Sequence, residues 1–282
     1  MMQQKRTEIP TMRDKVYKSY EYVLSEMEHH YGARVHLLAD PVLLTQLARL
    51  CEPDTVQPEV NYLVRDLYES LVRVVIAREL PRREVEVRTR MFAATEAGVW
   101  RGSLLDPETR VVTVGIARAG TQPSQIAFET LTRLLSPHRV RQDHIYMNRE
   151  TGADGAVVGI NVSGSKLGGD AAGCIVLLPD PMGATGGSMD KAISIYKGLT
   201  GGAPAKIIAL NLIVTPEYLR TLRDKHSDVT VYALRLDRGL SEPDILSTPL
   251  GQSWDKERGL NERQYIVPGA GGLGEILNNS YV

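Results

Sequence analysis

The sequence predicts an α/β protein with a mostly parallel sheet that is flanked by helices. From residue 110 onward, apolar runs rich in valine and isoleucine follow one another at 110–117, 173–179, 205–214 and 229–236. Stretches with helical periodicity come after the first three runs, at 124–135, 189–202 and 215–226. Strands that are apolar on both faces and alternate with helices form parallel sheets covered on both sides. With 282 residues, the chain can bury a sizeable core around such a sheet.

The residues before 110 have a different, mainly helical pattern. Apolar side chains recur at 3.6-residue spacing over 12–32, and residues 59–78 form a second, strongly amphipathic stretch. Asp40 and Pro41 are typical of a helix start, and Leu43 and Leu47 then mark the buried side of that helix. We therefore expect a helical N-terminal extension over residues 1–37, followed by the main domain over 38–282.

Composition and charge exclude several function classes. The formal net charge is −1, so no global basic field attracts nucleic acid, and an anion must be held by a local site. No apolar stretch is long enough to span a bilayer, and the first residues lack the apolar segment of a signal peptide. Cys51 and Cys174 are far apart and match no metal-ligand spacing. We expect a cytoplasmic protein that has neither nucleic acid nor membrane as a partner.

One loop carries most of the chemistry. The run LLPDPMGATGGSM, residues 177–189, ends a predicted strand at Asp180 and leads through glycines into a predicted helix. Ligands collect at the carboxyl edge of a parallel sheet, where glycines let amides converge and a helix N-terminus adds positive charge. Thr185 and Ser188 add hydroxyl donors. The loop lacks the lysine of a Walker motif and is not a GxGxxG fingerprint. The pattern therefore predicts a site for a phosphate monoester beside a carboxylate that accepts from sugar hydroxyls.

Several segments resemble the uracil phosphoribosyltransferase family. DPMGATGGS at 180–188 is similar to that family's loop DPMLATGGS for phosphoribosyl diphosphate (PRPP), with Gly183 where leucine is usual. GIARAG at 115–120 is similar to the diphosphate-binding loop, and IYMNRET at 145–151 resembles a YRNEET segment. NERQYIVPGAGGLGE at 261–275 resembles the terminal segment that ends in GYIIPGLGDAGD. The resemblance implies a type I phosphoribosyltransferase fold with a small C-terminal hood over the base site, and an insertion at 241–260.

The resemblance also assigns roles to individual residues. It implies that Arg118 and Asp180 are catalytic, because they match the family's contacts to the diphosphate and to the ribose hydroxyls. The implied PRPP contacts are Arg118, Asp180, Pro181, Met182, Gly183, Ala184, Thr185, Gly186, Gly187 and Ser188. The implied uracil contacts, read mostly by main-chain groups, are Ile266, Gly271, Gly272 and Leu273.

The implied reaction joins uracil to PRPP and gives UMP and diphosphate. Breaking the anomeric C–O bond builds positive charge on the ribose and negative charge on the diphosphate, so the chemistry needs anion stabilisation and alignment rather than a covalent nucleophile. We expect Mg²⁺ to be held mainly by the substrate's own oxygens and waters, with no metal site built from protein side chains. Family enzymes are commonly homo-oligomers and some respond to GTP, so the resemblance implies an oligomer and GTP as a candidate effector.

Two departures from the family pattern leave alternatives open. Met147 stands where the family has an arginine, and Gly272 stands where it has an aspartate; both positions lie beside PRPP in the family. A regulator that binds PRPP or a nucleotide without turnover is therefore a second hypothesis. A phosphoribosyltransferase for another base is a third, motivated by the insertion and by the altered GGLGE segment.

Overall fold

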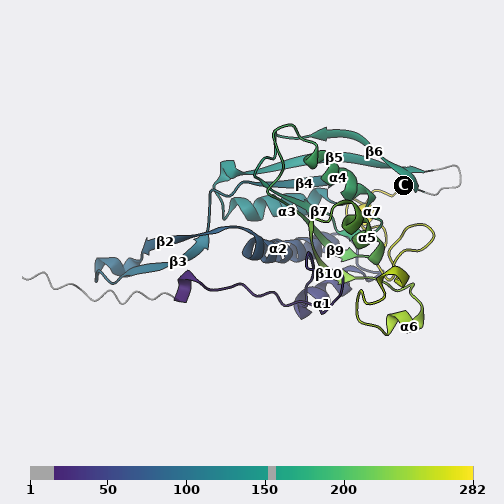
Figure 1. Cartoon of the computed structure of the whole chain (residues 1–282), viewed down its shortest axis with the longest axis horizontal. Helices are drawn as coiled ribbons and strands as arrows, with labels where there is room; N and C mark the ends of the chain where they lie inside the picture. Colours follow the sequence, from purple (N-terminus) through teal and green to yellow (C-terminus); the bar gives the residue numbers. More distant parts are fainter. Residues whose placement is uncertain (1–15, 152–156, 282) are drawn as a thin grey trace, which may run out of the picture.

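A mostly parallel eight-stranded sheet forms the centre of the molecule, as the sequence predicts (Figure 1). The structure is a computed structural model that describes residues 16–151 and 157–281. The strand order is β1-β10-β9-β7-β4-β5-β6, and the short β8 pairs with β9. β6 alone of these strands runs antiparallel to its neighbour, β5. The strands are β1 (Val35–Leu37), β4 (Val111–Ala117), β5 (Val140–Thr151), β6 (Val157–Lys166), β7 (Ile175–Pro179), β8 (Met182–Gly183), β9 (Lys206–Val214) and β10 (Thr230–Leu236).

Helices cover both faces of this sheet. Alternate residues of a strand point to opposite faces, so neighbouring residues such as Val176 and Leu177 belong to different apolar clusters. On one face the sheet packs against α1 (Pro41–Leu50), α2 (Glu59–Glu79) and α3 (Thr121–Thr132). On the other it packs against α4 (Gly187–Lys197) and α5 (Pro216–Lys225). The remaining short helical elements are α6 (Pro243–Leu246), α7 (Leu273–Ile276), η1 (Val16–Lys18), η2 (Arg90–Ala93), η3 (Pro137–Arg139) and η4 (Trp254–Lys256).

The two predicted helices after residue 38 form where their capping and periodicity place them. The side chain of Asp40 accepts hydrogen bonds from the amides of Val42 and Leu43, which caps α1. α2 runs for 21 residues and buries one side completely, including Leu67 and Leu71 at 0% exposure. Burial of a leucine contributes about 1.5–3 kcal/mol, so this helix anchors one layer of the core. In the described part of the chain, no helix combines the length and the apolar character that crossing a bilayer requires.

The helix expected over 12–32 is wrong for the residues that the structure describes. Residues 16–37 contain a three-residue 3₁₀ turn, an extended stretch and strand β1. Val16 and Val23 are 70% and 81% exposed, so their helical spacing does not correspond to a buried face. The backbone is held by tertiary hydrogen bonds instead, for example from the Met27 amide to the Leu37 carbonyl at 2.8 Å. These contacts replace the helical hydrogen bonds that the periodicity suggested.

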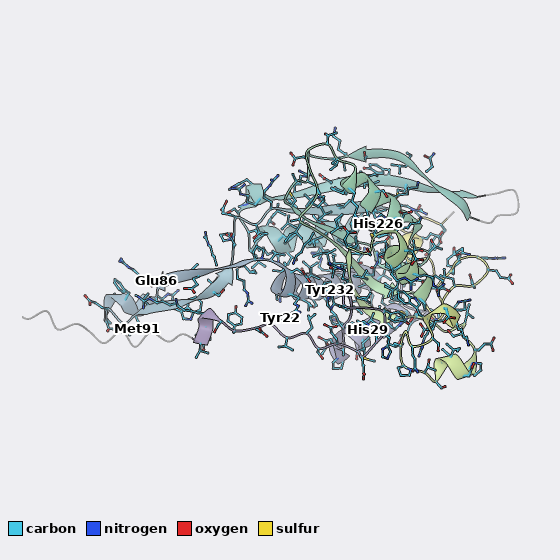
Figure 2. All side chains as sticks on the ribbon, viewed as in Figure 1. Tyr22, His29, Glu86, Met91, His226 and Tyr232 are labelled. Carbon is cyan, nitrogen blue, oxygen red and sulfur yellow. The ribbon has the colours of Figure 1, made fainter. Side chains whose placement is uncertain are left out.

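An antiparallel arm projects from the body and was not foreseen from the sequence (Figure 1). Strands β2 (Arg82–Arg88) and β3 (Val99–Leu105) pair with each other, outside the central sheet. Figure 2 places Glu86 and Met91 on this arm, far from Tyr232 and His226 in the body. Val85 and Val87 alternate with charged residues in β2, but most of its side chains are exposed, so this alternation does not correspond to a face buried against the core.

Candidate active site

The candidate site lies where the strand order of the sheet changes direction. After β4 the chain crosses to β5 on one side, and it later returns to place β7 on the other side of β4. Such a switch point opens a crevice at the carboxyl ends of the strands, where α/β proteins bind their ligands. Arg118 directly follows β4 and Asp180 directly follows β7. The two loops touch, since a Cβ atom at Gly120 would lie 2.8 Å from the carbonyl oxygen of Pro179.

In the 180–188 loop, the carbonyl groups are tied back toward the protein. Each carbonyl from residue 180 to 186 accepts a hydrogen bond. Side chains supply three of these bonds: Asn211 to the Asp180 carbonyl at 2.6 Å, Thr215 to the Ala184 carbonyl at 2.7 Å, and Thr221 to the Thr185 carbonyl at 2.8 Å. Main-chain amides supply the others, which go to the carbonyls of Pro181, Met182, Gly183 and Gly186.

The amide groups of the same loop are left available. Within the described residues, the N–H groups of Thr185, Gly186 and Ser188 donate to no protein oxygen. They lie at the N-terminus of α4, which runs for 11 residues and adds its partial positive charge. Gly186 adopts φ +85°, and a Cβ atom there would lie 2.9 Å from the Cβ of Thr221. With carbonyls tied back and amides free, the loop can hold an anion of phosphate size.

Two buried tyrosines contact the residues of β9 that bond the main chain of Asp180. The Tyr68 hydroxyl donates to the Leu210 carbonyl at 3.1 Å, and the Leu210 carbonyl also accepts from the amide of Asp180 at 3.0 Å. The Tyr218 hydroxyl donates to the side chain of Asn211 at 3.0 Å. Burial, and then the nearby charge of Asp180, hold the pKa of both tyrosines well above its ordinary value. Both phenols therefore stay protonated and orient the strand ends beneath the carboxylate.

Arg118 is held by the C-terminal end of the chain. Its side chain is exposed, and its Nη1 donates to the Ser280 carbonyl at 2.9 Å and to the Ser280 hydroxyl at 3.0 Å. Ser280 is placed by its own amide, which donates to the carbonyl of Glu275 at 3.1 Å. Guanidinium groups carry five N–H donors, so these contacts leave other donors of Arg118 for an anion.

The predicted base-binding residues form one loop beside Arg118. Ile266 and Leu273 are buried at its two ends, with 7% and 2% exposure. Gly271 is exposed and adopts φ +66°. A Cβ atom at Gly274 would lie 3.3 Å from the Cβ of Ala119, so the segment packs on the Arg118 loop. The structure thus brings three sets of predicted residues to one edge of the sheet: Arg118, the 180–188 loop and the 266–273 loop.

Comparison with known proteins identifies the family. A family model described as uracil phosphoribosyltransferase matches residues 37–257. The chain belongs to this family. Membership makes it a phosphoribosyltransferase, a glycosyltransferase-type enzyme.

Relatives of the uracil phosphoribosyltransferase family match over most of their length. The protein of that name from Dictyoglomus thermophilum is 30% identical over 84% of this chain and 95% of its own. The one from Caldanaerobacter subterraneus subsp. tengcongensis is 27% identical over 86% of this chain and 96% of its own. Among solved structures, the AQ2163 protein from Aquifex aeolicus superposes with a TM-score of 0.67 at 23% identity, covering 88% of this chain and 99% of that one. The predicted fold class is confirmed by this likeness.

Gly183, which stands where the family has leucine, has a packing explanation. A Cβ atom at Gly183 would lie 2.9 Å from a methyl of Val214 and 3.0 Å from the ring of Tyr218. The space that a larger residue would need is therefore filled by the tyrosine that supports Asn211.

Met147 lies on β5, where it is partly buried against the apolar cluster of α4 and α5. A Cβ atom at Gly272 would lie 2.7 Å from a carboxylate oxygen of Glu275, which fills that position.

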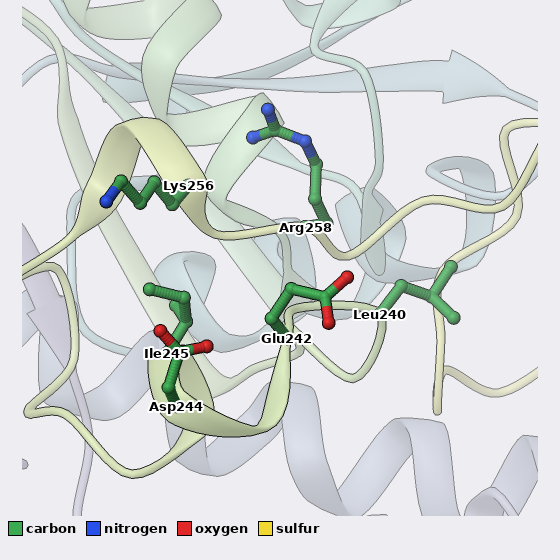
Figure 3. A pocket seen from close by; sticks show the side chains of 6 residues that line it. All are labelled: Leu240, Glu242, Asp244, Ile245, Lys256 and Arg258. Carbon is green, nitrogen blue, oxygen red and sulfur yellow. The ribbon is translucent and has the colours of Figure 1, made fainter.

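The 241–260 segment, together with Leu240, forms a surface cavity (Figure 3). The cavity measures about 320 Å³ and is lined by Leu240, Glu242, Asp244, Ile245, Lys256 and Arg258. Figure 3 shows Glu242 and Asp244 on one side of the cavity and Lys256 and Arg258 on the other. Both ends of the segment are tied to the loop, since the Gly239 amide donates to the Val267 carbonyl at 3.0 Å and the Val267 amide to the Gly259 carbonyl at 2.8 Å.

Sequence reasoning missed the residues that shape the site from behind. Thr215, Thr221 and Asn211 hold the carbonyls of the 180–188 loop, and Ser280 holds Arg118. Only Thr215 carries a sequence signal, because threonine before Pro216 is typical of a helix N-cap. The other residues are ordinary polar side chains until the fold brings them to the loop.

Proposed function

We propose that this enzyme transfers the phosphoribosyl group of PRPP to uracil and releases UMP and diphosphate. The observation that carries the proposal is the 180–188 loop, whose carbonyls accept hydrogen bonds from the protein while the amides of Thr185, Gly186 and Ser188 are left available in the loop that Asp180 begins. This arrangement suits a 5′-phosphate, which is a dianion that takes several N–H donors at once. The names of the relatives support uracil as the acceptor.

In this proposal the substrate contacts follow the site geometry. The 184–188 segment holds the 5′-phosphate, through the amides of Thr185, Gly186 and Ser188 and the hydroxyls of Thr185 and Ser188, and the main chain of 181–183 forms the wall of the loop. Asp180 accepts from the ribose hydroxyls, and Arg118 donates to the diphosphate. Main-chain groups of Ile266 and of Gly271, Gly272 and Leu273 read the uracil edge.

The reaction needs alignment and charge stabilisation. The bond between ribose C1 and the diphosphate oxygen breaks, and its electron pair leaves on the diphosphate. A bond forms from N1 of uracil to C1, and the N1 proton is released. Arg118 stabilises the charge that grows on the diphosphate, an effect of about 2.7–4 kcal/mol for a well-placed donor in other enzymes. Holding both substrates in one crevice removes much of the entropic barrier.

Magnesium is a substrate-bound partner in this proposal. Mg²⁺ favours substrate phosphate oxygens and waters, so we expect PRPP itself to supply most of its ligands. Within the described residues, no group of three His, Cys, Asp or Glu side chains could hold a metal ion. When bound, the cation neutralises charge on PRPP. A homo-oligomeric state, a response to GTP and a cytoplasmic location stay predictions.

A direct assay tests the proposal. Full-length protein is incubated with Mg²⁺, PRPP and labelled uracil, and UMP and diphosphate are quantified, while calorimetry measures PRPP binding. Formation of UMP supports the proposal. If diphosphate is released with another base but not with uracil, that base is the acceptor. PRPP binding without diphosphate release for any base favours a regulator, and absence of binding refutes the phosphate role of the 180–188 loop.

A further inference from the structure

An ion pair between the partly buried Arg235 and the buried Asp237 holds both main-chain groups of Gly269, in the middle of the 266–273 loop. Asp237 directly follows β10 and is 2% exposed. Its carboxylate accepts from Arg235 Nε at 2.7 Å, from Arg235 Nη2 at 2.8 Å and from the Gly269 amide at 2.7 Å. Arg235 Nη2 also donates to the Gly269 carbonyl at 3.2 Å. The pair therefore contacts the loop through a donor and an acceptor at one residue.

Gly269 is the tight point of this loop, so holding it fixes its neighbours. It adopts φ +63°, a conformation that favours glycine. A Cβ atom there would lie 2.2 Å from the carbonyl oxygen of Ile266, because the chain closes back on that residue. Rotation of the Gly269 peptide would carry Ile266 on one side and Gly271 on the other. The ion pair resists that rotation from the side of the loop that faces the sheet.

Stability alone gives a poor reason for this pair. Removing two charges from water is costly, and replacing a buried ion pair by apolar residues of similar size is often neutral or stabilising. Burial opposes the charge of Arg235, yet the hydrogen bonds and charge of Asp237 hold the pKa of Arg235 above its ordinary value. Arg235 therefore stays charged, and its hydrogen bonds to Asp237 are strong and directional.

The chain contains a second pair of the same design at the other end of the sheet. Arg141 and Asp143 on β5 have the same spacing, and their side chains are 26% and 1% exposed, against 26% and 2% for Arg235 and Asp237. Asp143 accepts from Arg141 Nε at 3.2 Å and from the Gly168 amide at 2.9 Å. Arg141 lies opposite Val112, near the start of β4, so this pair lies away from the carboxyl edge.

We propose that Arg235 and Asp237 are positioning residues for base recognition, which hold the 266–273 loop in the orientation that reads the acceptor base. The inference rests on the proposed function, because it assigns base reading to that loop. It separates base binding from PRPP binding, since the 180–188 loop is held by Asn211, Thr215 and Thr221 and shares none of these contacts.

The test compares R235M/D237L with the matched variant R141M/D143L. We expect R235M/D237L to raise the KM for uracil roughly tenfold to hundredfold, because this is the change that the loss of a hydrogen bond to a charged group produces. The affinity for PRPP should change less than twofold. The urea midpoint of this variant should fall only slightly, because the Gly269 amide loses its acceptor while the two charges are replaced by apolar groups. R141M/D143L should leave both substrate constants unchanged. That variant also leaves the Tyr196 hydroxyl without Asp143, so its stability loss should be the larger. An equal rise of the uracil KM in both variants would overturn the proposal.

Hydrogen exchange of the loop provides a readout that does not depend on activity. The amides of residues 266–273 should exchange faster in R235M/D237L than in the parent. Their exchange rates in R141M/D143L should equal those of the parent. Faster exchange without a higher KM for uracil would overturn the positioning role. Unchanged exchange would show that the ion pair does not restrain the 266–273 loop. D237N retains the size of the side chain and serves if the double variant does not fold. A parent that makes no UMP refutes the proposed function, while the exchange data still decide whether the pair restrains the loop.

Discussion

Thr221→Val is the sharpest test of the 180–188 loop. The hydroxyl of Thr221 donates to the carbonyl of Thr185 at 2.8 Å, and the side chain packs against Gly186. Valine keeps the shape and removes the donor. The carbonyl of Thr185 then has no partner on α5 and can turn toward the bound phosphate, where its negative end is repelled.

The expected size of the effect follows from one hydrogen bond. A neutral hydrogen bond contributes about 0.5–1.5 kcal/mol, so we expect the KM for PRPP to rise roughly 2- to 12-fold. The 5′-phosphate is held equally in the ground state and the transition state, so kcat should change little. Steady-state kinetics with varied PRPP at saturating uracil measure both constants.

A matched control makes this prediction refutable. Thr130 on α3 makes a similar bond to the carbonyl of Ile126 at 2.9 Å, within its own helix. Thr130→Val should leave the KM for PRPP unchanged, and Thr221→Ser should restore most of the parental value. If Thr221→Val and Thr130→Val gave the same KM for PRPP, the hydrogen bond to Thr185 would have no part in phosphate binding.

Three further predictions concern packing, the C-terminus and pH. Gly183→Leu, which restores the family residue, should destabilise the fold by about 1–3 kcal/mol in urea unfolding, because the space is already filled; an unchanged midpoint would contradict this packing. Removing residues 280–282 frees Arg118 and should raise the KM for PRPP roughly threefold to tenfold while the KM for uracil is unchanged, with Ser280→Ala giving a smaller rise. Burial alone would raise the pKa of Asp190, but hydrogen bonds from Lys225 and His226 lower this pKa below its ordinary 3.8. The stability that the Asp190 carboxylate contributes is therefore complete above pH 3.8 and is lost as the pH falls through the lower folded-state pKa. The difference in urea midpoint between parent and Asp190→Asn should therefore be constant near pH 5 and shrink below about pH 3.8, and a difference that persisted in acid would rule this out.

The sheet and the 180–188 loop could be predicted because their signals are local. Apolar runs buried on both faces indicate parallel strands, and a carboxylate followed by glycines at the carboxyl end of a strand indicates a ligand-binding loop. The arm over 82–105 was missed although Val85 and Val87 alternate with charged residues, because β2 pairs only with β3 and buries no face against the core. Residues 16–37 misled because exposed apolar side chains such as Val23 happened to fall at helical spacing. Thr221, Ser280 and Asp237 depend on contacts between distant segments, which a single sequence does not reveal.

The fully bonded carbonyls of residues 180–186 also bear on how quickly the enzyme engages its substrate. Because hydrogen bonds already hold these carbonyls, the loop needs no rearrangement when the ligand binds. Crystals grown with and without a sugar phosphate should therefore superpose here within coordinate error, and association should be limited by diffusion and ionic strength rather than by a slow isomerisation.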